Sequence, residues 1–397
     1  MSERWTNWSG AVSCSPHAIA AAHDEAELAA LVHVASREGR TVRPLGAGHS
    51  SSGLCACDDA VLVSLERWRG LESVDPAAGT ARVRAGTELH ELGAALFAHG
   101  LALHNLGDID RQALAGALAT GTHGTGRTLG NLSSAVTGLR FVRADGEIAE
   151  LDAGRAGDAD LLRAARVSLG TLGVVTAVTL RVVPAHRLHE RVWRAPLDEV
   201  FERLEEWVAV HRHFEFFYFP KHDFAECKAL RPTEAPPASV AGRAGERIGW
   251  SHALLPSVRE ARFHEMEYSV PAAIGPACFR ELAARLRALH PEVVWPMEYR
   301  TVAADDALLS MAGGRDTVSI SVHQDGRYPH EPVFAALEPI AVEAGGRPHW
   351  GKWHRLRAPE LARLYPAWER FRAVRRGLDP NGVFLSPYLR TLLGEEP

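Results

Sequence analysis

The string GAGHSS at residues 46–51 is the first segment whose residue types suggest chemistry. Two glycines within three residues let backbone amides approach an anion closely, and the segment directly follows an apolar run at 41–45. A dinucleotide-binding turn of the Rossmann type is excluded, because Ser51 replaces the third glycine and residues 53–59 do not resemble the helix of such a unit. From this segment alone, His49 is either a turn histidine with a backbone hydrogen bond or part of a ligand-binding loop.

A second glycine-rich segment, GALATGTHGTG at residues 116–126, follows the string GDID at 107–110. Its glycines and hydroxyl side chains are dense enough to wrap a diphosphate, and the alternative is a loop with several positive-φ glycines. A third segment, GTLGVVT at 170–176, predicts a glycine turn that leads into an apolar strand. Many β-turns have this pattern, so this third segment indicates no ligand by itself.

Two charged motifs lie further along the chain. Glu298 and Arg300 are two residues apart and would share one face of a strand, where they form either part of a site or a surface ion pair. The string HWGKWH at 349–354 sets Lys352 between two tryptophans, which is unusual for a solvated face. His349 and His354 lack metal-ligand spacing and nearby acids, so we expect no metal site.

The elements around these motifs alternate between strands and helices. Residues 41–45 and 60–65 predict buried strands, 80–84 a half-exposed strand, and 88–99 an amphipathic helix that Gly100 ends. A hairpin at 139–146 and a long strand within 172–183 follow. The residue composition and pattern of the sequence change at Pro184, and we expect a second α+β domain from there to about residue 350. A last helix is predicted at 359–375, ended by Gly377.

The composition excludes several classes of protein. The chain has 397 residues, enough for two domains, and 46% of them are hydrophobic. A formal charge of −5 without any basic run argues against nucleic-acid binding. No segment has the roughly 20 apolar residues of a membrane helix, and the N-terminus lacks the apolar region of a signal peptide. Five cysteines, an odd number, fit a reduced cytoplasm, and Cys55 and Cys57 are a weak zinc pattern.

Taken in order, the motifs resemble one known family closely. GAGHSS, ALATGTHGTG, SLGTLGVVT, EYRTVAAD, GRDTV and HWGKWH are similar to strings of the aldonolactone oxidase and alditol oxidase group of the vanillyl-alcohol-oxidase flavoprotein superfamily. The resemblance implies an α+β fold with a two-subdomain FAD-binding domain and an inserted α+β cap domain that binds substrate. It assigns residues 1–183 to the FAD-binding domain, 184–350 to the cap and 351–397 to a segment that returns to the FAD-binding domain.

The resemblance also implies the cofactor and its contacts. In this family the histidine of the first motif is bonded to the 8α-methyl of FAD, and that residue here is His49. The other FAD contacts that it implies are Arg43, Gly46, Ala47, Gly48, Ser50, Ser51, Gly107, Gly116, Thr120, Gly121, Thr122, His123, Gly124, Gly173, Val174 and Val175.

The implied reaction is oxidation of a carbinol by hydride transfer to flavin N5, after which dioxygen becomes hydrogen peroxide. Glu298, Arg300 and Lys352 would line the substrate site. Arg300 suits an electrostatic clamp on a developing alkoxide, and Glu298 can accept a hydrogen bond from a substrate hydroxyl. Lys352 would take the hydroxyl proton if its pKa is lowered, or stabilise the reduced flavin anion. Gly107 stands where a small residue admits oxygen, which predicts an oxidase.

The choice of substrate stays open at this stage. Asp108 stands where alditol oxidases have a serine, and His354 is typical of the lactone-oxidising branch, whereas GRDTV fits the alditol branch as well. His323 is either a further substrate contact or an ordinary strand histidine. We expect an aldono-1,4-lactone oxidase of the L-gulono or D-arabinono type. The alternatives are a polyol oxidase and a partner-dependent flavin dehydrogenase that reacts poorly with oxygen.

Overall fold

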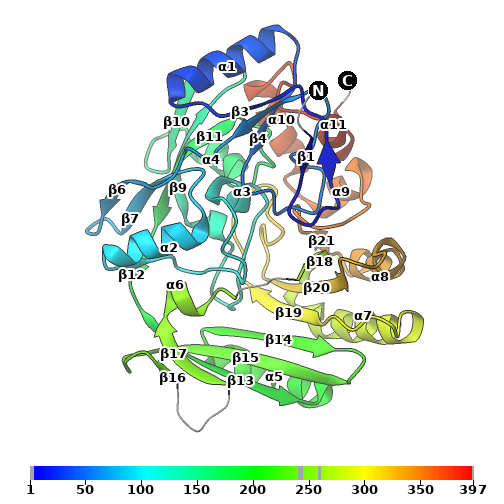
Figure 1. The fold of residues 1–397 in the computed structure, drawn as a ribbon. Helices are drawn as coiled ribbons and strands as arrows, with labels where there is room; N and C mark the ends of the chain where they lie inside the picture. Colours follow the sequence, from blue (N-terminus) through cyan, green and yellow to red (C-terminus); the bar gives the residue numbers. More distant parts are fainter. Residues whose placement is uncertain (1–3, 240–244, 258–260, 396–397) are drawn as a thin grey trace.

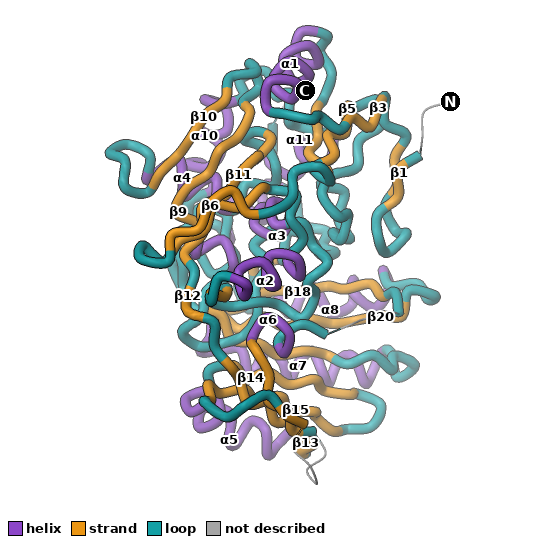
Figure 2. Tube along the Cα trace, turned by 60° about the vertical axis from the view of Figure 1, so that its left-hand side comes forward, coloured by secondary structure: helices purple, strands orange, loops and turns teal. Residues whose placement is uncertain are grey.

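The computed structural model describes residues 4–239, 245–257 and 261–395, and it confirms the α+β class. The first three residues of the N-terminal segment considered above lie outside the described residues. Figures 1 and 2 show two parts stacked one above the other, with the first half of the chain and the C-terminal helices in the upper part. The predicted division at residues 183/184 and 350/351 stays a prediction.

The upper part contains two main sheets. A parallel sheet of order β3-β5-β4 (Ala18–Ala20, Val61–Ser64, Val42–Leu45) is packed beside helix α1 (Glu25–Arg37). An antiparallel sheet has the order β10-β9-β11-β7-β6 (Ile148–Asp152, Val136–Val142, Val174–Arg181, Thr80–Arg84, Leu71–Asp75). Helices α2 (Leu89–Ala98), α3 (Leu114–Ala119) and α4 (Ala159–Arg166) pack with this second sheet, together with the one-turn helix η1 (Leu132–Ala135). Two short strand pairs, β1 with β2 (Trp5–Thr6, Ser13–Cys14) and β8 with β12 (Leu101–Ala102, Val183–Pro184), complete the upper part.

The predicted elements of the first half are confirmed with small changes at their ends. Helix α2 ends at Ala98, and Gly100 takes a φ of +72° that ordinary residues rarely adopt. The predicted hairpin is the antiparallel pair β9 and β10.

The lower part is built on one antiparallel sheet of nine strands, which we call the cap sheet. Its order is β16-β17-β13-β15-β14-β19-β20-β18-β21. The strands are β13 (Arg187–Ala195), β14 (His213–Phe219), β15 (Phe224–Thr233), β16 (Ala238–Ser239), β17 (Glu246–Trp250), β18 (Phe263–Pro271), β19 (Met297–Val302), β20 (Thr317–Asp325) and β21 (Arg347–Pro348). Helices α5 (Leu197–Val210), α7 (Gly275–Leu289) and α8 (Glu331–Glu343) contact it, and the short helices η2 (Ala272–Ile274) and α6 (Ser251–Leu254) lie at its ends.

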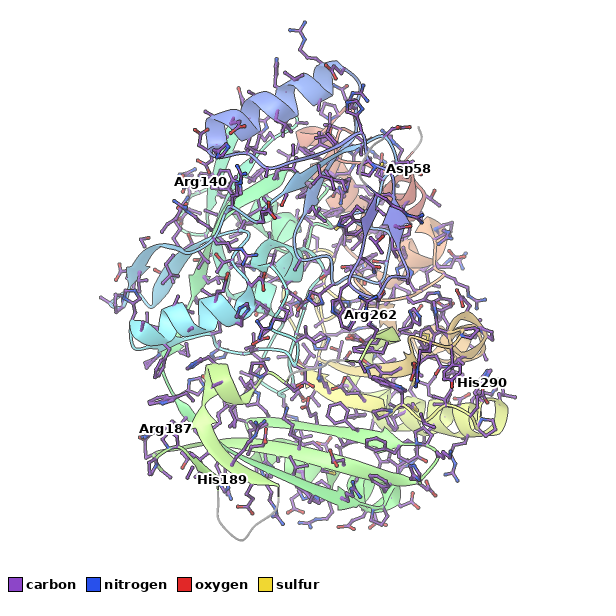
Figure 3. The ribbon with its side chains drawn as sticks, viewed as in Figure 1. Asp58, Arg140, Arg187, His189, Arg262 and His290 are labelled. Atoms are coloured by element: carbon purple, nitrogen blue, oxygen red, sulfur yellow. The ribbon has the colours of Figure 1, made fainter. Side chains whose placement is uncertain are left out.

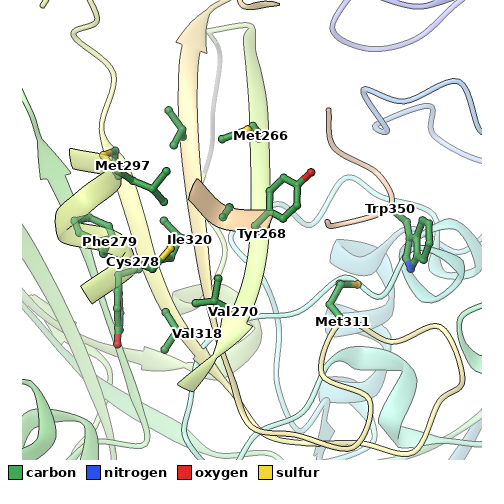
Figure 4. Close-up of a cluster of buried hydrophobic side chains, with 14 of the residues drawn as sticks. Met266, Tyr268, Val270, Cys278, Phe279, Met297, Met311, Val318, Ile320 and Trp350 are labelled. Carbon is green, nitrogen blue, oxygen red and sulfur yellow. The ribbon is translucent and has the colours of Figure 1, made fainter. Parts of the chain in front are cut away.

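One face of the cap sheet is apolar and the other is polar, because side chains alternate along each strand. Met266, Tyr268 and Val270 of β18 are buried together with Val318 and Ile320 of β20 (Figure 4). The residues between them, such as those at 265, 267 and 269, are polar and lie on the opposite face. Burial of the apolar face therefore fixes which side chains the sheet presents to the upper part.

The C-terminal segment joins the upper part again. Val42 of β4 donates its backbone N–H to the carbonyl of Val383, and Phe384 is buried in the core around β4 and β5. The single helix predicted at 359–375 is wrong: α9 (Ala358–Leu364) and α10 (Trp368–Leu378) are separated at Pro366, and α10 runs past Gly377. Proline lacks an N–H and disfavours helical backbone in the residue before it, which here is extended. Helix α11 (Pro387–Leu393) follows.

Arg262, just before β18, lies at the level where the two parts meet (Figure 3). Its guanidinium is 3.5 Å from the position that a Cβ would take at Gly10, so the N-terminal turn and the cap sheet contact each other there. Among the described residues, no helix is long and apolar enough to span a bilayer.

Candidate active site

A polar cleft of about 860 Å³ lies between the cap sheet and the loops of the upper part. Its lower wall comes from alternate residues of β18, β19 and β20, and its upper wall from the loops that carry the first two glycine motifs. The lining residues are Trp8, His49, Ser50, Ser51, Gly107, Asp108, Ile109, Gln112, Thr120, Thr122, His123, Phe263, Glu265, Glu267, Glu298, Arg300, His323, His349, Gly351 and Lys352.

Strand pairing brings the lower wall together. Glu298 of β19 lies opposite Ser321 of β20, and Ser321 lies opposite Glu267 of β18. Neighbouring strands are about 4.8 Å apart, so one row of side chains crosses all three strands on the same face. Glu265 and His323 form the adjacent row. The predicted residues Glu298, Arg300 and His323 thus lie on one wall of the cleft, although a long loop separates their two strands.

Arg300 is the centre of an ion-pair cluster. Its Nε donates to Glu215 at 2.8 Å, and its Nη2 contacts Glu298 and lies 3.3 Å from Asp108. Burial alone would lower the pKa of the guanidinium, but the three carboxylates outweigh it and raise that pKa well above the usual value. Lys228 completes the cluster, with its Nζ 3.0 Å from Glu215 and 3.3 Å from Asp108. Arg300 is therefore a permanent cation at the wall of the cleft.

Glu298 is the member of this cluster whose protonation is finely balanced. Burial raises the pKa of its carboxyl to about 7, and the carboxylates of Glu215 and Asp108 push in the same direction while Arg300 opposes them. A carboxyl group with this pKa exchanges a proton readily near neutral pH. It is thus better matched to proton transfer than an ordinary glutamate.

Lys352 does not have the lowered pKa that a general base would need. Burial would lower the pKa of its ammonium, but Glu265, which it contacts directly, and Glu267 raise it above the usual value. The condition for the role of proton acceptor, a lowered pKa, is therefore not met here, and the geometry favours the alternative role of a fixed cation. The two tryptophans do not enclose it either, since Trp350 stacks on Tyr365 at 5.0 Å and Trp353 packs against Phe334.

The side chain of His123 makes hydrogen bonds within the protein at both of its ring nitrogens. Its Nδ1 lies 2.8 Å from the carbonyl of Gly124 and its Nε2 lies 2.6 Å from the carboxylate of Glu267, so both nitrogens act as donors. Burial opposes the charge, but Glu267 raises the pKa of the imidazole above its usual value. This side chain belongs to the wall of the cleft, and it is not available to a diphosphate.

The two predicted substrate histidines separate. His323 lines the cleft, with its Nδ1 2.7 Å from the carbonyl of Pro296 and its Nε2 3.6 Å from Glu265. His354 does not line the cleft; its ring packs edge-on against Trp350, and desolvation lowers the pKa of its imidazole to about 4. Contact between His354 and substrate stays a prediction, and the geometry of the cleft gives it no support.

Two further cavities continue the cleft upward. A less polar groove of about 750 Å³ shares Ser50 and Thr120 with it. A smaller cavity of about 430 Å³ shares Gly46 and Gly116 with the groove and His49 with the cleft. A long ligand with an apolar end and a polar end could occupy all three, as FAD requires.

The backbone of the groove also fits such a ligand. A Cβ at Gly116 would meet nothing within 4 Å and would project into the groove, where the main chain must come close to a ligand. At Gly173, φ is +153° and a Cβ would lie 2.6 Å from the carbonyl oxygen of Val142, so only glycine is tolerated. The groove and the smaller cavity are lined by the following predicted FAD contacts: Arg43, Gly46, Ala47, Gly48, His49, Ser50, Gly116, Thr120, Gly173 and Val175.

Four predicted FAD contacts also have structural roles, and their contact with FAD stays a prediction. The guanidinium of Arg43 is buried and donates to four backbone carbonyls, so it ties the C-terminal segment to the upper part although it borders the groove. Val174 is fully buried in the core. Gly121 packs near Met311, and a Cβ at Gly124 would lie 2.4 Å from the carbonyl oxygen of Leu106. The cavities named above do not include these last three residues.

His49 joins the small cavity to the cleft. Its ring lies 5.5 Å from that of Trp8, and burial together with the charge of Lys352 lowers the pKa of its imidazole. The neutral ring keeps a nitrogen lone pair at physiological pH, which a bond to a flavin carbon would require.

Comparison with known proteins decides the family. A model of the D-arabinono-1,4-lactone oxidase family matches residues 178–247 and 238–392, and a model of an FAD binding domain matches residues 16–152. An L-gulono-1,4-lactone dehydrogenase from Mycobacterium tuberculosis is 38% identical over 99% of this chain and 100% of its own length. The chain belongs to the D-arabinono-1,4-lactone oxidase family.

The names of other proteins similar to this chain describe several activities. An L-gulonolactone oxidase from Bos taurus is 30% identical over 97% of each chain, and an alditol oxidase from a Streptomyces species is 32% identical over 99% of this chain and 100% of its own length. A solved cholesterol oxidase from B. sterolicum superposes with a TM-score of 0.84 at 16% identity, covering 99% of this chain and 97% of its own. That last similarity shows a shared fold.

Sequence reasoning missed several titratable residues of the candidate site. They are Glu265, Glu267 and His349, which line the cleft, and the ion pair of Glu215 and Lys228 behind it. The signal was present: acidic residues at 265 and 267 alternate with apolar ones, and Glu215 stands within the aromatic run 214–219. Alternation of this kind also fits a solvated strand face, and only the pairing of the strands shows that this face is buried.

Proposed function

We propose that this chain is an FAD-dependent oxidoreductase that oxidises a CH–OH group of a sugar-derived substrate, foremost an aldono-1,4-lactone. The names of the family model and of the two lactone-oxidising relatives support this substrate class. The observation that carries the proposal is the ion pair of Glu298 and Arg300 in a polar cleft that continues into a less polar groove lined by glycines.

The cleft suits a small molecule with several hydroxyl groups. Carboxylates accept hydrogen bonds from hydroxyls, and the cations of Arg300 and Lys352 donate to carbonyl or hydroxyl oxygens. Because both signs of charge lie on fixed strands, the bound molecule is oriented by several directed contacts. An apolar substrate would offer these charged groups no hydrogen-bonding partner and would exclude water from them.

The reaction divides its electrons and protons between cofactor and protein. Bound FAD supplies the acceptor for the hydride, which carries both electrons of the broken C–H bond. Arg300 stabilises the negative charge that develops on the carbinol oxygen, and Glu298 takes the hydroxyl proton as the C=O bond forms. Lys352 remains protonated, and its positive charge favours a negatively charged reduced cofactor nearby.

The cofactor would be held mainly by the glycine motifs. His49 forms the covalent bond to the 8α carbon of the flavin, and the backbone around Gly46, Gly116 and Gly173 borders the remainder. Ser50 and Thr120 line both groove and cleft, so they would contact the middle of the cofactor.

The electron acceptor is the second part of the proposal. Gly107 lines the cleft and has no side chain to block the approach of dioxygen, so we assign reoxidation to oxygen with release of hydrogen peroxide. A relative that is called a dehydrogenase makes a protein or dye acceptor the main alternative. The Streptomyces relative makes a linear polyol the main alternative substrate.

One panel tests these assignments together. Purified flavoprotein is incubated with L-gulono-1,4-lactone, D-arabinono-1,4-lactone, xylitol and sorbitol, with either oxygen or an artificial dye as acceptor. We expect lactone-dependent peroxide, lost in R300A by at least about a thousandfold, which corresponds to about 4 kcal/mol of transition-state stabilisation. Faster turnover of the polyols would overturn the lactone assignment, and dye reduction without peroxide would overturn the oxygen assignment.

A further inference from the structure

Lys228 and Glu215 lie behind the cleft and do not line it. Lys228 of β15 and Glu215 of β14 face each other across the paired strands; the side chain of Glu215 is buried and that of Lys228 is 12% exposed. Each also reaches a residue that does line the cleft: Lys228 contacts Asp108, and Glu215 accepts from Nε of Arg300. These two residues therefore support the first layer of the site from below.

The contacts have a directional consequence. Glu215 holds the Nε edge of Arg300 and so fixes the plane of the guanidinium, whose Nη2 faces both Glu298 and Asp108. Lys228 ties Asp108, on a loop of the upper part, to the cap sheet. A second contact supports that loop, since Ser257 donates its backbone N–H to the carbonyl of Asp108.

The charges of the cluster do not balance. Three carboxylates, Asp108, Glu215 and Glu298, face two cations, Arg300 and Lys228, within a buried volume. With every group ionised the cluster has one excess negative charge, which a low-dielectric site disfavours. The cluster therefore binds one proton readily. Without the positive charge of Lys228 the excess negative charge would be two, and the cluster would bind protons more strongly.

We propose that Lys228 and Glu215 are positioning residues: they orient Arg300 and Asp108 and set the charge of the cluster, so that Glu298 is the member that gains and loses the proton. This inference rests on the proposed function for its meaning in catalysis. The raised pKa of the Glu298 carboxyl, about 7, agrees with it.

Other charged groups surround Glu298. They are Arg300 on its own strand, Glu215 on β14, Glu265 on β18, His323 on β20, Asp108 on its loop and Lys352 after β21. Lys228 on β15 and Glu267 on β18 act on this group through Glu215, Asp108 and Arg300. Apart from Lys228 and Glu215, none of these neighbours is altered in the variants below, so a shift in those variants is attributable to these two positions.

The test uses opposite changes of charge. In K228M the cluster loses a positive charge and should take up its proton at higher pH, whereas in E215Q it loses a negative charge and should take it up at lower pH. We expect the acid limb of the rate of flavin reduction, measured anaerobically with L-gulono-1,4-lactone, to move by about one pH unit in each direction. The double variant K228M/E215Q should return the limb close to its wild-type position.

Three controls accompany these variants. K228R keeps the charge and should keep the limb in place, and K221M removes the charge of an exposed lysine and should not move it. Flavin content and melting temperature of each holoenzyme separate altered chemistry from poor folding. A purely structural role predicts lower stability with an unmoved limb, and that result would overturn the inference, as would shifts of the same sign in K228M and E215Q.

A second measurement does not need a substrate. Infrared difference spectra of the holoenzyme across pH follow the band of a protonated carboxyl group, which E298Q identifies by removing it. Opposite shifts of this titration in K228M and E215Q support the inference even where no lactone or polyol reduces the flavin, a result that would overturn only the proposed function. A titration that neither variant moves overturns the inference itself.

Discussion

Lys352 and Glu265, 87 residues apart in the chain, form an ion pair at the wall of the cleft, in which the glutamate is buried and the lysine is partly exposed. Because the pKa of the lysine is raised and that of the glutamate is lowered, each holds the other in its charged form. Removal of one partner leaves a buried charge without compensation, which typically costs about 3–5 kcal/mol. We expect K352M to lower the stability of the holoenzyme by about this amount, measured by denaturant unfolding.

The double variant K352M/E265Q is the matched control for that prediction. It removes both charges and should recover most of the stability, while the rate of flavin reduction stays low because the cleft still lacks its lysine cation. K352M as stable as the wild type would show that Glu265 finds another partner, and the pair would then not be the structural support described above.

The pH dependence of flavin reduction should report Glu298. Its carboxylate form is the proton acceptor, so the rate should fall as the pH falls through about 7, and E298Q should have a low rate without this limb. The sign for stability is the opposite. A carboxyl whose pKa is raised on folding stabilises the fold below its unfolded pKa, about 4.3, and this contribution is lost as the pH rises through about 7. Denaturant unfolding of wild type and E298Q across pH measures this difference.

The chain shows which parts of a site can be predicted from sequence. The two-residue spacing of Glu298 and Arg300 places them on one strand face, and the family resemblance assigned that pair to the substrate site. The partners of Arg300, Asp108 and Glu215, come from a loop and from another strand, and the order of strands in the cap sheet is not written in any local pattern.

Local signals predict strands and helices well but do not predict contacts between distant segments. The spacing of apolar residues and the glycine turns specify β4, β5, β7 and α2, because those signals act over a few residues. The charge states of Lys352 and Glu298 depend instead on burial and on carboxylates from distant strands. Burial alone would have lowered the pKa of Lys352, and the carboxylates of Glu265 and Glu267 on another strand reverse the sign.

Gly107 offers a test of oxygen access with a built-in constraint. A Cβ at this position would lie 2.9 Å from the carbonyl oxygen of His123, so the local backbone must shift to admit any side chain. We expect G107A to slow reoxidation of the reduced flavin by oxygen about tenfold or more, while reduction by the lactone changes less. Stopped-flow measurement of the two half-reactions separates them, and equal slowing of both would show a general distortion of the cleft.

His354 should be dispensable for substrate binding. It packs edge-on against Trp350, outside the residues that line the cleft, and its imidazole is neutral at pH 7 because desolvation lowers its pKa to about 4. We expect H354L to change the KM for the lactone by less than about twofold, with a stability change within roughly 1–2 kcal/mol. H323L is the matched comparison, because His323 lines the cleft and its loss should raise KM or lower kcat. A large KM effect in H354L would place that residue in the site after all.

The covalent attachment of flavin should depend on His49 alone among the histidines near the cleft. Its ring lies where the small cavity meets the cleft, and its lowered pKa leaves a neutral nitrogen for bond formation. We expect the denatured wild-type band to fluoresce under ultraviolet light after acid treatment and H49A to lose this fluorescence. H123A is the matched control, because His123 is held by Glu267 and Gly124 and should not affect the linkage. Flavin that stays attached in denatured H49A would move the bond to another residue, whereas flavin released from denatured wild type would leave FAD bound without any covalent bond.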